Sequence, residues 1–258
     1  MSGASELRGS KRRAKSDWGE QLYQPTSRHD PQNMILAALP REEYSHLHRY
    51  LEFVQLRSED ILWEPNQPIE SVYFPNSGMV SFVAVMSNGA TVEVGMTGRE
   101  GFVGTPIFLG ARDASVRAIV PINGDGFRIE SELLRRILRR SPQLDQMLLR
   151  YAHSYATQVE QTAACNCLHQ VSERLARWLA TSHDLTDSDL LPLTQEFLAQ
   201  MLGCRRSSVS AAIGSLQRAG AIRCARGHIR ILNRKDLARK ACECYEVMRR
   251  LTYPAKIG

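Results

Sequence analysis

The stretch LPLTQEFLAQMLGCRRSSVSAAIGSLQRAGAI, residues 191–222, contains two helical patterns separated by a glycine. Thr194 is a residue type that caps helices, and the apolar positions after it recur at helical spacing: Phe197, Leu198, Met201 and Leu202. Gly203 supplies the backbone freedom of a tight turn. A second helix begins near Arg205, with inward positions three and four apart: Val209, Ala212, Ile213 and Leu216. The stretch therefore predicts a helix-turn-helix.

Basic and small polar side chains gather at the start of the second helix: Arg205, Arg206, Ser207, Ser208 and Ser210. A recognition helix contacts base edges with its N-terminal residues, so we expect these side chains to face DNA. Residues 222–231 then read as two short strands about a glycine turn, the pattern of a wing, and its Arg226, His228 and Arg230 would contact phosphates. The alternative is a helical hairpin inside another domain, with ordinary solvated charge on its outer face.

The distribution of charge agrees with a nucleic-acid partner. The 258 residues carry a net charge of +6 and are 43% hydrophobic, enough to bury a core in about two domains. Residues 168–258 hold 15 Lys or Arg and 8 Asp or Glu, whereas residues 31–167 hold 12 and 15. The basic excess thus lies with the helix-turn-helix. No apolar run approaches the roughly 18 residues of a membrane span, and the N-terminus is polar, so a cytoplasmic protein without a membrane partner is expected.

The rest of the chain predicts a division into four parts. Residues 1–30 are polar and mildly basic, which favours a disordered tail. Residues 33–57 predict two short helices and a strand. Apolar residues then alternate with a period of two, which predicts further strands at 72–74, 79–85, 91–94 and 116–120. Turns are expected at 75–78, 87–89 and 123–126. Such closely spaced strands suggest a small antiparallel barrel or roll. The expected domains are the tail, a β-roll sensor domain at 31–130, a dimerisation helix region at 131–167 and a winged helix-turn-helix domain at 168–258, an α+β fold.

Residues from Glu130 to about Ala164 return to a helical period. Six positions recur at spacings of four and three: Leu144, Leu148, Tyr151, Tyr155, Val159 and Thr162. This stripe is typical of a helix that pairs with its symmetry mate. The other interpretation is that the stripe packs onto its own domain.

The order of roll, long helix and winged helix-turn-helix resembles the Crp-Fnr superfamily of bacterial transcription regulators. The likeness is strongest in Leu193–Ile222 and in Val171–Leu179. It implies a homodimer whose two recognition helices enter successive major grooves of a palindromic site, with RNA polymerase as a further partner.

The same resemblance suggests roles for single residues of the helix-turn-helix. Arg206 falls on the arginine that reads guanine in the cyclic-AMP receptor protein, and Gln195 takes the position of a phosphate contact. Ser207 replaces the glutamate that follows that arginine, and Ala211 replaces the family's second arginine. The expected operator therefore differs from that of the family's best-known member.

The cyclic-nucleotide cassette of the family is altered in this chain. Gly104 and Arg112 match it, but Thr105 replaces the glutamate that holds the ribose hydroxyl. Asp113 stands where a hydroxyl residue should donate to the cyclic phosphate, and it places a like charge beside an anion. We expect these four effector-pocket candidates to form no strong cyclic-AMP site; a small-molecule effector is unidentified and is not expected to be cyclic AMP. A cyclic-nucleotide-responsive regulator with an atypical ligand site is the alternative.

Six cysteines raise the question of metal or redox chemistry. The iron-sulfur branch of the superfamily uses N-terminal cysteines, whereas this chain has none before Cys165. Cys165-Asn166-Cys167 and Cys242-Glu243-Cys244 hold a four-ligand site only if the two pairs meet in space, and residues two apart on a helix point to different sides. We therefore expect no metal and no cofactor, with a regulator that senses redox state or metal through its thiols as the alternative.

Two other classes of function fit the sequence less well. The sequence contains no Gly-x-Ser-x-Gly and no Gly-Lys-Ser/Thr phosphate loop, and its histidines have no metal-ligand spacing, so an enzyme is not expected. The second class, a ligand-binding regulatory module that does not bind DNA, would leave the basic charge of the C-terminal part unexplained. The sequence thus predicts a DNA-binding regulator.

Overall fold

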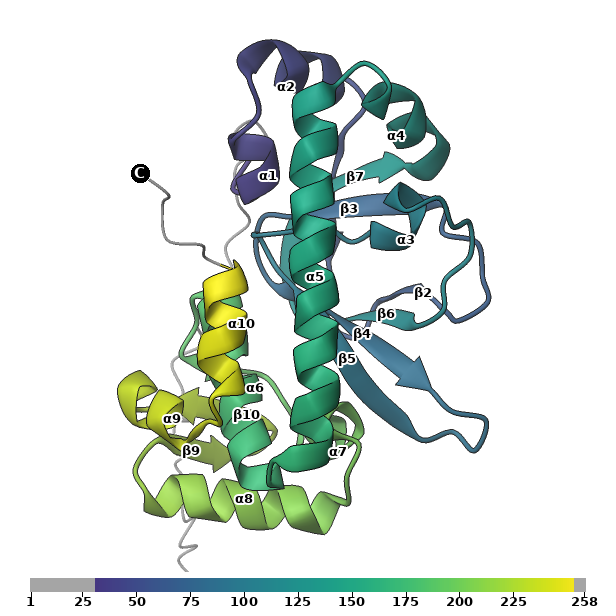
Figure 1. Ribbon diagram of the computed structural model, residues 1–258. Helices are drawn as coiled ribbons and strands as arrows, with labels where there is room; N and C mark the ends of the chain where they lie inside the picture. Colours follow the sequence, from purple (N-terminus) through teal and green to yellow (C-terminus); the bar gives the residue numbers. More distant parts are fainter. Residues whose placement is uncertain (1–30, 253–258) are drawn as a thin grey trace, which may run out of the picture.

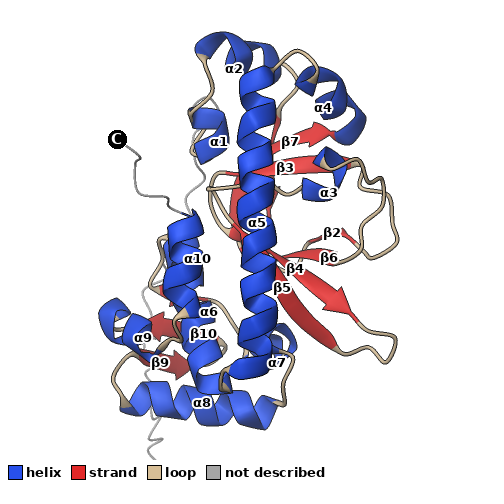
Figure 2. Ribbon diagram, in the orientation of Figure 1, coloured by secondary structure: helices blue, strands red, loops and turns tan. Residues whose placement is uncertain are grey.

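The computed structural model describes residues 31–252, so the predicted tail of residues 1–30 lies outside the described residues. A β-roll, a long central helix and a small helical domain with a hairpin follow one another in this order (Figure 1). The central helix runs along the roll, and the C-terminal helices and hairpin gather at its far end, as the colouring by secondary structure makes plain (Figure 2). This is the predicted α+β architecture. Helices long and apolar enough to cross a membrane do not occur within residues 31–252.

Two antiparallel sheets enclose the core of the roll. One has the strand order β1-β7-β3 and the other the order β2-β6-β4-β5. Their bounds are β1 Glu52–Leu56, β2 Ile61–Trp63, β3 Ser71–Pro75, β4 Met79–Val85, β5 Thr91–Thr97, β6 Arg117–Ile122 and β7 Gly124–Glu130. The strands predicted from period two correspond to β3, β4, β5 and β6, and the strand expected after the first two helices is β1. The two strands β2 and β7 were not predicted.

The predicted turn at residues 123–126 is wrong, because β7 already begins at Gly124. The chain does not reverse there but passes from one sheet into the other, since β6 pairs with β2 and β4 whereas β7 pairs with β1 and β3. A Cβ at Gly124 would lie 2.0 Å from the carbonyl oxygen of Ser77, and one at Gly126 would lie 2.3 Å from that of Phe74. These glycines therefore permit a close backbone approach rather than a turn.

Helices cover the ends and one side of the roll. The short ones are α1 Met34–Ala37, α2 Arg41–His48, α3 Thr105–Phe108 and α4 Ser131–Leu138. The predicted helical region from Glu130 divides into α4 and the long α5, Pro142–Leu168, which starts with a proline at its first turn. After α5 the extended residues His169 and Gln170 break the helix. Gln170 then forms a capping box with Glu173 and starts α6, Val171–Thr186.

The stripe that could have paired with a symmetry mate packs largely onto the roll of its own chain. Leu144 and Leu148 are fully buried in the roll core, and Tyr151 and Tyr155 pack against it. The Tyr151 ring lies 5.2 Å from that of Phe102, and the Tyr155 ring lies 5.2 Å from that of Phe82. For these residues the second interpretation, packing onto the chain's own domain, is confirmed, and the homodimer stays a prediction.

The C-terminal domain contains the remaining elements. They are β8 Leu190–Leu191, α7 Gln195–Leu202, α8 Arg206–Arg218, β9 Ile222–Ala225, β10 His228–Ile231, α9 Arg234–Lys240 and α10 Cys244–Thr252. One hydrophobic core joins this domain to the roll, because Met79, Val83 and Met96 of β4 and β5 share it with Trp178 and Leu198. The helix-turn-helix is thus held against the sensor domain by buried apolar contacts.

Candidate nucleic-acid interface

The helix-turn-helix has the local structure that its sequence predicts. The Thr194 hydroxyl accepts a hydrogen bond from the Phe197 N–H at 3.1 Å and caps α7. Gly203 ends α7 in the left-handed conformation, with φ of +58°, and so turns the chain toward α8. No side chain in the described part of the protein caps α8, whose N-cap is Arg205. The first N–H groups of α8 therefore remain available to an anion such as a DNA phosphate.

The predicted recognition residues lie on the outer face of α8. Its inward positions Val209, Ala212, Ile213 and Leu216 are all buried. The predicted DNA contacts on and just before this helix are exposed, except for the half-buried Ser208: Arg205, Arg206, Ser207, Ser208 and Ser210. Neither Arg205 nor Arg206 forms a side-chain hydrogen bond or an ion pair with another residue in the 31–252 range. Within the described residues both guanidinium groups are therefore open to an external partner.

The start of α8 borders a groove against the roll. The groove has a volume of about 850 Å³ and is lined by Arg205 and Arg206 on one side and by the β4 to β5 hairpin on the other. The Thr91 hydroxyl donates to the Gln200 carbonyl oxygen at 3.4 Å, and a Cβ at Gly203 would lie 3.0 Å from the Val92 side chain. The turn of the helix-turn-helix therefore rests directly on the sensor domain.

The wing is a tight hairpin made by β9 and β10. Arg226 and Gly227 both have positive φ, +48° and +79°, as in the two-residue turn that suits a twisted hairpin. Arg226 and His228 are exposed, and Arg230 is half-buried. The register places Arg223 directly opposite Arg230. Arg223 is exposed and extends the basic surface; it was not among the predicted DNA contacts, although the Arg-Gly turn fixes this register.

Gln195, the predicted phosphate contact, lies beside the wing. It is half-buried at the start of α7, and its side chain hydrogen-bonds the Cys224 thiol of the wing. Burial raises the pKa of that thiol, and the hydrogen bond from Gln195 acts in the opposite direction. The side chain of Gln195 thus links α7 to the wing.

The four effector-pocket candidates differ in burial. Gly104 precedes α3 and packs against Val72, where a Cβ would lie 2.6 Å from the valine methyl groups. Thr105 is buried, and its hydroxyl has no hydrogen-bond partner among the residues described. Arg112 and Asp113 are exposed in the loop before β6. The two halves of the altered cassette therefore face different surroundings.

Arg112 faces a hollow that is unsuited to an anion. This hollow of about 520 Å³ is also lined by Glu70, Glu130, Glu132 and Arg135. Three carboxylates against two guanidinium groups repel a cyclic phosphate rather than neutralise it. Inside the roll, aromatic rings pack against one another, such as Trp63 with Phe82 and Phe102 with Phe108. The unpartnered Thr105 hydroxyl offers a phosphate a hydrogen bond but no charge.

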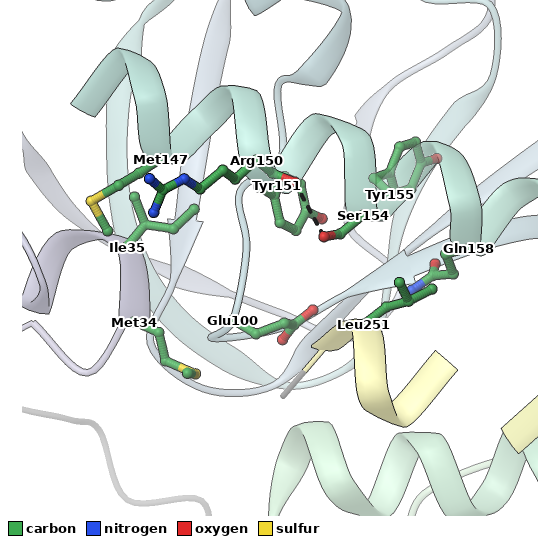
Figure 3. A pocket seen from close by; sticks show the side chains of 10 residues that line it. All are labelled: Met34, Ile35, Glu100, Met147, Arg150, Tyr151, Ser154, Tyr155, Gln158 and Leu251. Carbon is green, nitrogen blue, oxygen red and sulfur yellow. Dashed lines mark hydrogen bonds between the residues drawn. The ribbon is translucent and has the colours of Figure 1, made fainter. Parts of the chain in front are cut away.

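A second, mostly apolar hollow of about 240 Å³ lies beside α5 (Figure 3). Glu100 and Leu251 line one side of it, and Tyr151 and Ser154 of α5 lie opposite. The Glu100 carboxylate accepts hydrogen bonds from the Gly98 N–H at 3.0 Å and the Thr97 hydroxyl at 3.1 Å. Burial raises the pKa of Glu100. Its carboxylate already stabilises the loop after β5, so this hollow offers a mostly apolar wall with the acidic Glu100 and the basic Arg150.

Comparisons with known proteins agree with both halves of the chain. Residues 53–141 match the cyclic nucleotide-binding domain, and residues 173–240 match the Crp-like helix-turn-helix domain. No curated protein sequence matches the chain.

Several solved structures share the fold. A putative transcriptional regulator of the Crp/Fnr family from Eubacterium rectale has a TM-score of 0.64 and 16% identity, over 81% of this chain and 98% of that one. The c-di-GMP responsive global regulator CLP of Xanthomonas campestris has a TM-score of 0.60 and 17% identity, over 75% and 100%. FixK2 from Bradyrhizobium japonicum has a TM-score of 0.60 and 16% identity, over 74% and 98%.

The two matched domains occur in the order in which the roll and the helix-turn-helix follow each other in the structure. With a cyclic nucleotide-binding fold ahead of a Crp-like helix-turn-helix, the chain belongs to the Crp-Fnr superfamily of transcription regulators.

Proposed function

We propose that this protein binds a palindromic DNA operator as a homodimer and that its effector is a small molecule other than cyclic AMP. Residues 31–130 form the sensor in this proposal, residues 131–167 form the dimerisation region, and residues 168–258 bind DNA in the cytoplasm with RNA polymerase as a further partner. The carrying observation is the uncapped, exposed start of α8, where Arg205 and Arg206 have no partner among the described side chains.

In this proposal, Arg206 recognises the base sequence of the DNA. Its planar guanidinium can donate two parallel hydrogen bonds to the O6 and N7 atoms of guanine. Arg205 and Ser208 flank it, and the wing supplies charges for the phosphate backbone through Arg226, His228 and Arg230. Phosphate contacts position the domain, whereas base contacts select the sequence.

The homodimer is supported by a face of α5 other than the stripe from Leu144 to Thr162. Exposed positions recur along this helix at alternating spacings of four and three: Leu149, His153, Ala156, Glu160, Ala163 and Cys167. This is the spacing of a helix pair, and its two alanines permit close approach of a second helix. The face lies opposite the side that Leu144 and Leu148 bury in the roll.

Selection of DNA from a random pool by the purified protein is expected to enrich a two-fold palindrome equally with and without cyclic AMP. The acidic hollow at Arg112 and the filled interior of the roll are the reasons for the nucleotide independence. Sequencing of the selected pools shows whether the enriched site is a palindrome and whether its enrichment depends on cyclic AMP. Enrichment that requires cyclic AMP would contradict the assignment of the effector, and selection of single, asymmetric half-sites would contradict the homodimer.

Arg206→Ala and Arg230→Ala are expected to weaken DNA binding in different ways. Loss of a bidentate guanine contact in Arg206→Ala removes about 1–3 kcal/mol of discrimination at one base of each half-site. Arg230→Ala removes a phosphate interaction, so it weakens binding to all sequences and lowers the slope of log affinity against log salt by about 1. Fluorescence anisotropy on operator and random duplexes at several salt concentrations measures both. If Arg206→Ala loses the same affinity for the operator duplex as for the random duplex, Arg206 does not contact a specific base.

A further inference from the structure

The two Cys-x-Cys pairs do meet in space. Cys165 near the end of α5, His169 just after it, and Cys242 and Cys244 before and at the start of α10 place their ligand atoms within 4.8 Å of one another. The Cys165 Sγ lies 3.5 Å from the Cys242 Sγ, and the Cys244 Sγ lies 3.5 Å from the His169 Nδ1. Three sulfurs and one imidazole nitrogen thus converge from segments 77 residues apart.

The sequence predicts that the two cysteines of each pair point to different sides of a helix. This is true of Cys165 and Cys167 but not of Cys242 and Cys244. Cys165 and Cys167 belong to α5, and they point to different sides, one buried and one exposed. Cys242 lies in the link between α9 and α10, outside any helix, so both it and Cys244 are buried while Glu243 between them is exposed. The second pair therefore supplies two ligands and the first pair only one, with His169 as the fourth.

We propose that Cys165, His169, Cys242 and Cys244 bind one Zn²⁺ ion. Zn–S bonds of about 2.3 Å in a tetrahedron place two sulfurs about 3.8 Å apart, close to the 3.5 Å between the Cys165 and Cys242 sulfurs. Three cysteines and one histidine form a common structural zinc set, in which the four protein ligands leave no position open for an exchangeable ligand. An iron-sulfur cluster requires more room, because its ligand sulfurs bind different iron atoms.

Neighbouring side chains orient the ligands as expected around a metal. The His169 Nε2 lies 3.1 Å from the Glu243 carboxylate, so its N–H can donate there while Nδ1 faces the thiols. The Gln161 side-chain amide donates to the Cys244 Sγ at 3.0 Å. A histidine held between a carboxylate and a group of sulfurs has the tautomer that metal binding needs, and a simple disulfide would give neither Glu243 nor His169 a role.

Two buried arginines match the charge of such a site. Three thiolates and one Zn²⁺ leave one negative charge, and Arg174 and Arg177 of α6 lie near Cys165 with only 7% and 3% exposure. The Nε atom of each has no hydrogen-bond partner among the described residues. A bound metal would also fasten α10 to α5 across the break between α5 and α6, and so fix the position of the DNA-binding domain on the central helix.

Elemental analysis of the full-length protein, isolated from cells without chelators, tests the site. We expect one zinc per chain in the wild type and at least a tenfold lower zinc content in Cys165→Ser and Cys244→Ser. Cys167→Ser, the exposed partner in the same Cys-x-Cys pair, is the matched control and should keep its zinc. Cobalt exchanged into the wild type should show thiolate charge-transfer and tetrahedral d–d absorption, a readout that does not depend on how the variants fold.

Glu243→Gln provides a milder test, because it leaves all four ligands in place. Loss of its support for His169 is expected to weaken zinc binding about 10–100-fold in a chelator competition. A zinc-free wild type, a cobalt spectrum without thiolate bands, or equal zinc loss in Cys167→Ser would each overturn the proposal. Operator selection by the metal-free protein would leave the proposed DNA function standing, so the two proposals fail separately.

Discussion

Trp178→Ala is expected to lower the free energy of unfolding by about 3–5 kcal/mol, the usual cost of removing a large buried aromatic side chain. Trp178 is 1% exposed in the core that the roll shares with the DNA-binding domain. Its indole N–H donates to the Glu93 Oε1 at 2.9 Å, and its ring packs edge-on against Phe197 at 6.4 Å. The substitution therefore opens a cavity and leaves a buried carboxylate with one hydrogen bond fewer.

Urea unfolding followed by far-ultraviolet circular dichroism measures this effect without depending on tryptophan fluorescence. Trp178→Phe is the matched control, since it keeps most of the apolar packing and removes only the N–H donor. Its expected cost of about 1–3 kcal/mol reflects the hydrogen bond that Glu93 no longer accepts. If Trp178→Ala lowers the free energy of unfolding by less than about 1 kcal/mol, well below the usual cost of such a truncation, Trp178 does not join the two domains in solution.

Glu93→Gln is expected to stabilise the protein at neutral pH and to have little effect near pH 4. Glu93 is 4% exposed on β5 and accepts hydrogen bonds from the Ser81 hydroxyl at 2.5 Å and the Trp178 indole. Burial raises the pKa of Glu93 to about 7, against the opposing effect of those two hydrogen bonds. The charged carboxylate is therefore disfavoured in the folded protein relative to the unfolded chain.

The sign of the pH dependence follows from the two pKa values of Glu93. The unfolded chain releases this proton near pH 4.3, whereas the folded protein keeps it until about pH 7. The contribution of Glu93 to the free energy of unfolding is fully present below the lower value, falls between the two, and is flat above the higher one. The total loss is about 3–4 kcal/mol. Glutamine keeps the acceptor for Trp178 and carries no charge, so Glu93→Gln should lack this loss.

The difference in unfolding free energy between Glu93→Gln and the wild type, measured in urea at intervals from pH 4 to pH 8, isolates this group from all others. We expect the difference to grow with pH in favour of the variant. Glu42→Gln, at an exposed position in the first turn of α2, is the control and should show little change. A difference that stays constant across this range would show that Glu93 is already charged at pH 5.

Local signals account for the parts of the fold and site that the sequence predicted correctly. The cap at Thr194, the left-handed turn at Gly203 and the apolar spacing from Val209 to Leu216 act over one to four residues, so they can be recognised in the chain itself. The same holds for the period-two strands of the roll. The exposed Arg223 could also have been found, because a two-residue turn at Arg226 and Gly227 fixes the residues on either side of it.

What the sequence by itself determined is the order of roll, long helix and winged helix-turn-helix, together with the outward face of α8. Tertiary structure alone decided which side of α5 meets the roll, because the buried stripe at Leu144 and the exposed stripe at Leu149 have the same periodicity. It also decided that Gly124 crosses between sheets and that Cys165 meets Cys242. These outcomes depend on contacts between distant segments, whereas periodicity and capping record only the preferences of neighbours along the chain.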